Sequence, residues 1–149
     1  MNKDAQAYWD AYWQGQIQPQ SVTAWQFGAD PDYLAQLVVD GIKTATCSGH
    51  IFYEVEKEPL PSEGEYSIVL NSNDKPTSII KTVEVTVTPM NEVSETFAIA
   101  EGEGDRTYQY WWDAHEAFFT KELKSINQEF SRDMLLVCER FEVIHVKEE

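Results

Sequence analysis

Three segments with the residue pattern of β-strands constrain the fold of this chain more than any other feature. Glu65–Leu70 and Ser78–Thr88 flank a turn-forming stretch, Asn71–Asp74, and the chain closes on a long apolar segment, Met134–Val146. Apolar and polar residues alternate along the second segment, which predicts one buried and one exposed face. Its residues expected to be buried are Ile79, Val83, Val85 and Val87. We expect all three segments to share one barrel-like sheet.

The rest of the sequence carries the periodicity and capping signals of helices, together with shorter elements. Asp30-Pro31 is a helix start and Gly41 the corresponding stop. Thr107–Lys124 predicts a longer helix with a broad apolar surface. Shorter elements are expected at Tyr8–Trp13, Val22–Phe27, Ile42–Ser48, Ile51–Glu56 and Ser94–Ala100. With no internal repeat or linker, the pattern predicts one α+β domain over residues 1–149.

The N-terminal residues lack the basic and apolar segments of a secretory signal, and no apolar stretch is long enough to span a membrane. We therefore expect a cytoplasmic protein without a membrane partner. Its two cysteines, Cys47 and Cys138, are then expected to be thiols.

The charge of the chain bears on its partners. Eleven Lys and Arg against 26 Asp and Glu give a formal net charge of −15, which repels a long polyanion. A modified nucleoside, a short RNA, or a partner protein that supplies positive charge fits this charge better than a long RNA held by its backbone. Solubility alone is a second explanation of the acidity.

Lys43 and Thr46 lie three residues apart at the junction between a predicted helix and a predicted strand. A threonine hydroxyl becomes an effective nucleophile when a neighbouring base removes its proton. A lysine serves as that base if burial lowers its pKa from about 10.4 towards neutrality. Residues three apart in a regular strand point to opposite faces, so the pair requires a turn or bend at Lys43. A solvated lysine beside strand-forming threonines is the plainer interpretation.

A second cluster, Glu101–Asp105, collects three carboxylates on a glycine-rich turn before a helix. Helix capping and solvation explain such a loop without a function. A carboxylate near a ligand would instead orient an amino group or protonate a leaving amine, and the glycines allow close approach.

The histidines, His50, His115 and His145, show no metal-ligand spacing, so we expect no metal site and no cofactor. His115 lies on the aromatic helix, where a structural histidine is the favoured interpretation. Trp25, Trp111 and Trp112 have the shape to stack on a nucleobase, although core packing is the more usual role.

Two motifs resemble the activating-signal-cointegrator homology (ASCH) family. Gly41–Ser48 resembles the glycine–lysine–threonine signature of these domains. Glu101–Arg106, followed by Trp111 and His115–Phe119, resembles the later half of longer bacterial members. The resemblance implies a PUA-like β-barrel with flanking helices, a cleft beside the signature strand, and an RNA or nucleoside ligand.

One branch of this family is an amidohydrolase that removes the acetyl group from N4-acetylcytidine with a lysine, a threonine and a glutamate. The resemblance places these roles on Lys43, Thr46 and Glu103, or on Glu101 in a shifted alignment. Where that branch has an arginine shortly after its threonine, this chain has Ser48. The residues expected to contact substrate are Thr44, Ser48, Glu101, Arg106 and Trp111.

The leading interpretation is a nucleoside-directed amide hydrolase in which Thr46 attacks, Lys43 takes the proton and Glu103 assists the leaving amine. Two alternatives stay open. One is an RNA-binding regulatory module that contacts phosphate through Lys43 and Thr44, against which the net charge weighs. The other is a metal-independent ribonuclease, against which the lack of a suitably spaced histidine pair weighs.

Overall fold

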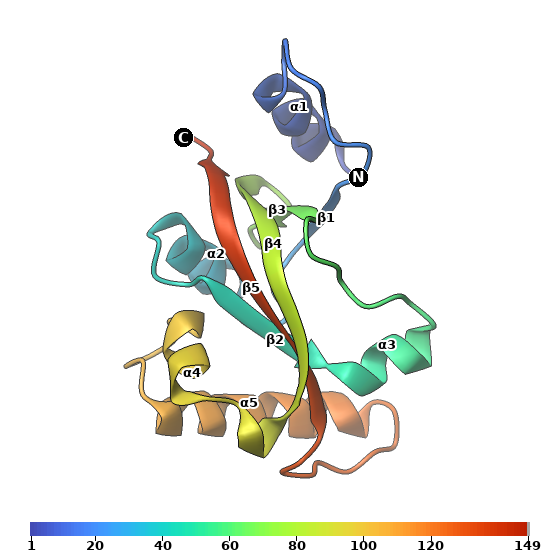
Figure 1. Cartoon of the computed structure of the whole chain (residues 1–149), viewed down its shortest axis with the longest axis vertical. Helices are drawn as coiled ribbons and strands as arrows, with labels where there is room; N and C mark the ends of the chain where they lie inside the picture. The colour runs from blue at the N-terminus through green and yellow to red at the C-terminus, as the bar shows by residue number, and fades with distance from the viewer. Residues whose placement is uncertain (149) are drawn as a thin grey trace.

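The computed structural model of the chain describes residues 1–148 and gathers its strands into one curled sheet (Figure 1). The strands are β1 (Thr23–Trp25), β2 (Ala45–Gly49), β3 (Tyr66–Leu70), β4 (Pro76–Pro89) and β5 (Leu135–Val146). The helices are α1 (Lys3–Tyr12), α2 (Pro31–Val39), α3 (His50–Glu56), α4 (Glu95–Glu101) and α5 (Tyr108–Lys124), with a short 3-10 turn, Met90–Glu92, after β4.

The strand order is β1-β3-β4-β5-β2, in which β1 and β3 run parallel and every other neighbouring pair runs antiparallel. The long strands β4 and β5 form the centre of the sheet and run along most of its length (Figure 1). The prediction that the three strand segments share one sheet is therefore confirmed, as is the α+β class with a barrel-like core.

The predicted faces of β4 are wrong in its second half. Val83 and Val87 are 45% and 44% exposed, whereas Thr82 is buried. The pairing of β4 with β5 shifts register between Thr82 and Glu84, which marks a bulge. Glu84 and Thr86 are exposed as well, and no residue from Val83 to Pro89 is buried, so this half of β4 has no buried face for the alternation to mark.

The helices cover the sheet at different places (Figure 1). Ala5, Tyr8 and Trp9 of α1 pack against Ile68 and Ile79, which makes the N-terminal aromatic stripe part of the core.

Among residues 1–148, none of the helices has the length and apolar character that a membrane span requires.

The helix α2 begins where its signals predict, since the Asp30 side chain accepts a hydrogen bond from the backbone N–H of Tyr33 and Pro31 occupies the first turn. Leu34 and Val38 of α2 pack against Ile80 of β4 and Phe141 of β5. This packing sets where the chain leaves α2 for β2.

The helix α5 packs through Trp111 and Phe119 against Leu136 of β5, together with residues of α4. The end of α4, the body of α5 and the end of α2 thus meet around the start of β2. The two sequence motifs, Gly41–Ser48 and Glu101–Arg106, lie at this meeting point.

Candidate functional site

The loop between α2 and β2 places Lys43 against the acidic loop that follows α4. The backbone N–H of Thr44 donates to the carbonyl of Ala100 at 2.8 Å, which joins the two segments. Gly102 has φ +74°, and a Cβ there would lie 2.7 Å from the carbonyl oxygen of Ile42. A side chain at this position would separate the loops, so the glycine is required by close approach.

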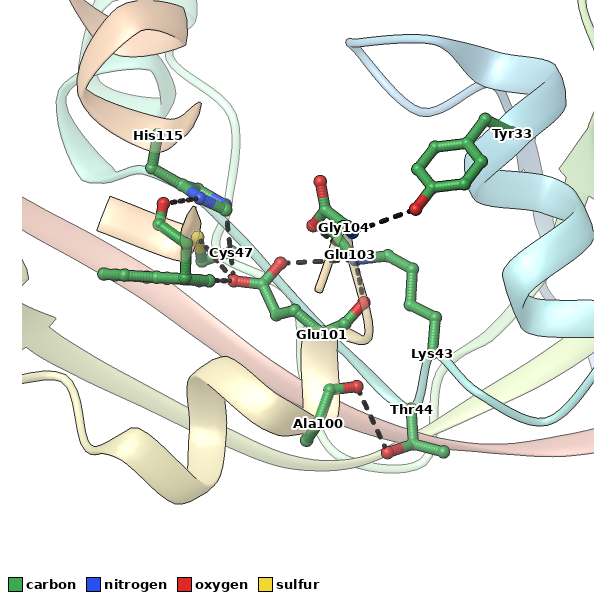
Figure 2. Close-up of polar contacts among 10 residues, drawn as sticks. Tyr33, Lys43, Thr44, Cys47, Ala100, Glu101, Glu103, Gly104 and His115 are labelled. Atoms are coloured by element: carbon green, nitrogen blue, oxygen red, sulfur yellow. Dashed lines mark hydrogen bonds and ion pairs between the residues drawn. The ribbon is translucent and has the colours of Figure 1, made fainter. Parts of the chain in front are cut away.

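The Lys43 side chain is buried, with 1% of its surface exposed, and its ammonium contacts two carboxylates. The Nζ atom lies 3.2 Å from Oε1 of Glu101 and 3.3 Å from Oε2 of Glu103 (Figure 2). Burial alone would lower the pKa of Lys43, but the two carboxylates outweigh it and hold the pKa above its ordinary value. The expectation of a lysine pKa lowered towards neutrality is wrong, because Lys43 is a paired cation.

Glu101 is the centre of the polar network: its carboxylate accepts three hydrogen bonds and makes an ion-pair contact with His115 (Figure 2). One oxygen accepts from Lys43. The other accepts from the Trp111 indole at 2.5 Å and the Cys47 thiol at 3.3 Å, and lies 3.3 Å from the His115 Nε2. Burial would raise the pKa of Glu101, but Lys43, His115 and Trp111 together lower it to about 2. Glu101 is therefore ionised and fully occupied.

His115 pairs with Glu101 in this network, a role that its place on an apolar helix did not indicate. Its Nδ1 lies 2.7 Å from the backbone carbonyl of Trp111, and its Nε2 lies 3.3 Å from the Glu101 carboxylate. Both neighbours only accept hydrogen bonds, so these contacts favour the doubly protonated ring. Burial lowers the pKa of His115, yet Glu101 raises it overall. The Trp111 ring stacks on the His115 ring with centroids 4.6 Å apart.

Cys47, Glu101 and His115 also place three possible metal-ligand atoms within 4.8 Å of one another, a spacing that the sequence did not predict. Each atom is already engaged, because the thiol and the His115 Nε2 both face the Glu101 carboxylate. Burial raises the pKa of the Cys47 thiol, which opposes the thiolate that a metal would need. The set fits a proton-bearing network better than a metal site.

A small cavity of about 110 Å³ opens onto this network. Its polar lining residues are Lys43, Thr46, Cys47, Glu101, Glu103 and His115, and Phe27 and Phe118 are among its apolar ones. The structure thus brings the three residues expected to be catalytic to one cavity. Glu103, at 17% exposure, is the more accessible of the two carboxylates.

A larger cavity of about 840 Å³ adjoins the small one and shares Thr46, Phe27 and Phe118 with it. Its carboxylates are Glu58, Glu65, Glu122 and Glu139, and its aromatic residues are Trp25, Phe27, Phe52, Tyr53, Phe118 and Phe119. Among the described residues that line it, none is a lysine, an arginine or a histidine. Thr46 therefore lies between an aromatic, acidic cavity and the charged network.

The comparison with known proteins agrees with this architecture. A model of the ASCH domain matches residues 23–145. The chain belongs to the ASCH domain family. A crystal structure of an ASCH domain from Lactobacillus crispatus is 36% identical, with a TM-score of 0.89 over 96% of this chain and 95% of the other. A protein from Enterococcus faecalis is 40% identical, with a TM-score of 0.85 over 98% and 91% of the two chains. No curated protein matches the chain significantly.

The residues of this ASCH domain expected to contact substrate lie in different surroundings. Ser48 lines the larger cavity, where its hydroxyl lies 2.9 Å from that of Tyr53. Trp111 is buried and binds Glu101, which leaves no free face for a nucleobase. Thr44 and Arg106 line neither cavity. The Thr44 hydroxyl donates to the Ala100 carbonyl at 3.5 Å instead (Figure 2).

The acidic loop of the ASCH domain is also held from α2. The backbone N–H of Gly104 donates to the hydroxyl oxygen of Tyr33 at 2.9 Å (Figure 2). Gly104 itself has φ +58°, in the left-handed region that glycine adopts readily. These contacts fix the backbone next to Glu103, so its carboxylate meets the small cavity from a defined side.

Glu139 is a further cavity residue that the sequence analysis missed. Burial raises its pKa to about 7, the Thr82 hydroxyl opposes that rise, and Glu65 adds to it. A glutamate directly after the apolar run Leu135–Cys138 was the available signal, since an unpaired carboxyl is costly to bury without a reason.

Proposed function

We propose that this ASCH domain is an amide hydrolase that acts on N4-acylated cytidine nucleosides. The observation that carries the proposal is the small cavity that Thr46, Glu103 and Lys43 all line, where the Lys43 ammonium lies 3.3 Å from the Glu103 carboxylate. A hydroxyl, a carboxylate able to exchange a proton, and a fixed positive charge are the groups that amide cleavage through a covalent ester needs.

Glu103 is the group best suited to take the proton of Thr46. The pKa values of Lys43 and His115 are both raised by the neighbouring carboxylates, which favours their protonated forms, and both oxygens of Glu101 already face donors. Glu103 accepts from Lys43 alone through one oxygen, and it lines the cavity with Thr46. This assignment revises the sequence-based hypothesis, in which Lys43 was the base.

The reaction then follows in two stages. Thr46 attacks the acyl carbon and passes its proton to Glu103, while the Lys43 ammonium stabilises the oxyanion. As the carbon–nitrogen bond breaks, Glu103 returns the proton to the leaving amine, which gives cytidine and an ester on Thr46. Water then attacks this ester and passes a proton to Glu103. As the bond from the acyl carbon to the Thr46 oxygen breaks, Glu103 returns that proton to the Thr46 oxygen, which releases the carboxylic acid and restores the free hydroxyl.

The larger cavity supports a nucleoside as the ligand. Its aromatic residues offer faces for a pyrimidine ring, and its volume of about 840 Å³ is in the range of small-molecule sites. Its four glutamates have no cationic partner in the described lining, so a phosphate group would be repelled. The proposed substrate is therefore the free nucleoside.

The RNA-binding alternative is weakened because the lysine expected to contact phosphate is not accessible. Lys43, the cation expected to bind phosphate, is 1% exposed and paired with Glu101 and Glu103. A ribonuclease would need a base and an acid near an exposed strand path, and His115 is buried against Glu101.

Incubation of the protein with a panel of N4-acylated cytidines, followed by chromatography, tests the proposal. We expect deacylation of the nucleosides and slower deacylation of the corresponding 5′-monophosphates. Glu103→Gln should lower kcat by about 10²–10⁴-fold, the usual contribution of an acid–base group. Glu95→Gln, an exposed glutamate on α4, is the matched control. No turnover of any member of the panel would contradict the proposal.

A further inference from the structure

Glu139 lies directly opposite Thr46 on the neighbouring strand. The two residues are Cα partners in the antiparallel pairing of β2 with β5. Direct partners of an antiparallel pair project from the same face of the sheet. Both side chains line the larger cavity, so a ligand that reaches Thr46 also passes Glu139.

The carboxyl group of Glu139 has one protein partner among the described residues. The hydroxyl of Thr82, itself buried, donates to Oε1 of Glu139 at 3.3 Å. The remaining oxygen has no hydrogen-bond partner in that part of the chain and is available to a ligand. Burying a carboxyl with one weak partner costs free energy, which a bound ligand would offset.

The surroundings of Glu139 favour its neutral acid form. The titratable groups around it in the cavity are Glu58, Glu65, Glu122, Tyr53 and Cys47, all neutral or negative, and its described lining has no cation. Burial raises the pKa of Glu139 to about 7. A bound nucleobase would exclude more water and favour the neutral form further.

We infer that Glu139, as the neutral acid, is a specificity-determining residue that donates its O–H to a ring acceptor of the pyrimidine while Thr46 faces the acyl group. The inference rests on the proposed function and names the group that recognises its substrate. The acceptor is the ring carbonyl oxygen or the unsubstituted ring nitrogen of the cytosine. An ionised Glu139 offers acceptors only and repels the same edge of the base.

The sign of the pH effect follows from this donor role. The donor is present below pH 7 and is lost as the carboxyl ionises above it. Affinity for the nucleoside should therefore be highest at pH 5.5 and fall by up to about tenfold per pH unit above 7. Glutamine keeps one donor and one acceptor but does not titrate, so Glu139→Gln should bind with nearly the same affinity at every pH.

Calorimetric titration of N4-acetylcytidine into Thr46→Ala protein at pH 5.5, 7 and 8.5 tests the inference without turnover. Glu139→Gln in the same background should remove the pH dependence, and Glu139→Ala should weaken binding about tenfold at pH 5.5. Glu142→Gln, an exposed glutamate on the same strand, is the matched control and should titrate like its parent.

Equal pH dependence with and without Glu139 would overturn the inference, as would absence of binding at every pH. Failure of the proposed reaction would look different. In that case the nucleoside binds with the predicted pH profile, but wild-type protein releases no acetate.

Discussion

Glu101 accepts a hydrogen bond from the Lys43 ammonium at 3.2 Å, and each of these side chains is 1% exposed. The pair joins the motif after α2 to the acidic loop after α4. His115 approaches the same carboxylate from α5, and Glu103 approaches the same ammonium. With His115 protonated, two cations and two carboxylates balance in charge, which explains how a strongly acidic chain buries this network.

Removal of one member of the Lys43–Glu101 pair should destabilise the fold. Lys43→Met removes the ammonium that faces both carboxylates and leaves His115 as the remaining oppositely charged neighbour of Glu101, and we expect the free energy of unfolding at pH 7 to fall by about 3–5 kcal/mol. Urea denaturation measures this change. The double variant Lys43→Met/Glu101→Gln should recover part of the loss, because it removes the buried carboxylate charge as well. A loss below about 1 kcal/mol in the single variant would show that the pair contributes little.

Stability should also fall in acid. The pKa of Glu101 is lowered in the folded state to about 2 from its ordinary value of 4.5. Its contribution to stability is therefore complete above pH 4.5 and is lost as the pH falls towards 2. Glu101→Gln should be less stable at pH 7 but should lose less of its Tm between pH 4.5 and 2. An identical acid-induced loss in both proteins would contradict the role assigned to Glu101.

Much of the fold could be predicted because its signals are local. The cap at Asp30, the helix after Thr107 and the apolar strand Met134–Val146 depend on neighbouring residues, and all three were found. The exposure of Val83 was missed because a bulge depends on how β4 pairs with β5, which the sequence of one strand does not encode.

In the candidate site, too, residues marked by local sequence signals could be predicted, and residues brought in by distant segments could not. Lys43 and Thr46 lie close in sequence and are marked by a family motif, so they could be selected. His115 and Glu139 reach the site through the packing of α5 and the pairing of β5 with β2. The protonation of Lys43 depends on Glu101 and Glu103, which lie 58 and 60 residues away. Spacing alone therefore assigned it the wrong protonation state.

The pH dependence of kcat separates a charged Lys43 from a basic one. The carboxylates hold the pKa of Lys43 above its ordinary value, so the ammonium persists through pH 9. If it stabilises the oxyanion, kcat at saturating substrate should be unchanged between pH 7 and 9. Steady-state kinetics with N4-acetylcytidine measure this profile. A kcat that rises about tenfold per pH unit would instead indicate that Lys43 must lose its proton to act.

RNA should bind weakly. The net charge of −15 and the acidic lining of the larger cavity both repel a phosphate backbone. We expect single-stranded RNA to bind with a Kd no tighter than about micromolar at physiological salt. Fluorescence anisotropy across a salt series measures it. Nanomolar binding with a steep salt dependence would restore the RNA-binding alternative.

Release of acetate from N4-acetylcytidine tests the central claim most directly, with wild-type, Thr46→Ala and Thr86→Ala proteins compared by chromatography. Thr86 is exposed on β4 and serves as the matched control. We predict that wild-type and Thr86→Ala proteins release acetate and cytidine in equal amounts. Thr46→Ala should retain binding but lose nearly all turnover, because a positioned water rarely replaces an activated hydroxyl. Unchanged turnover in Thr46→Ala, or none in the wild-type protein, would contradict the account.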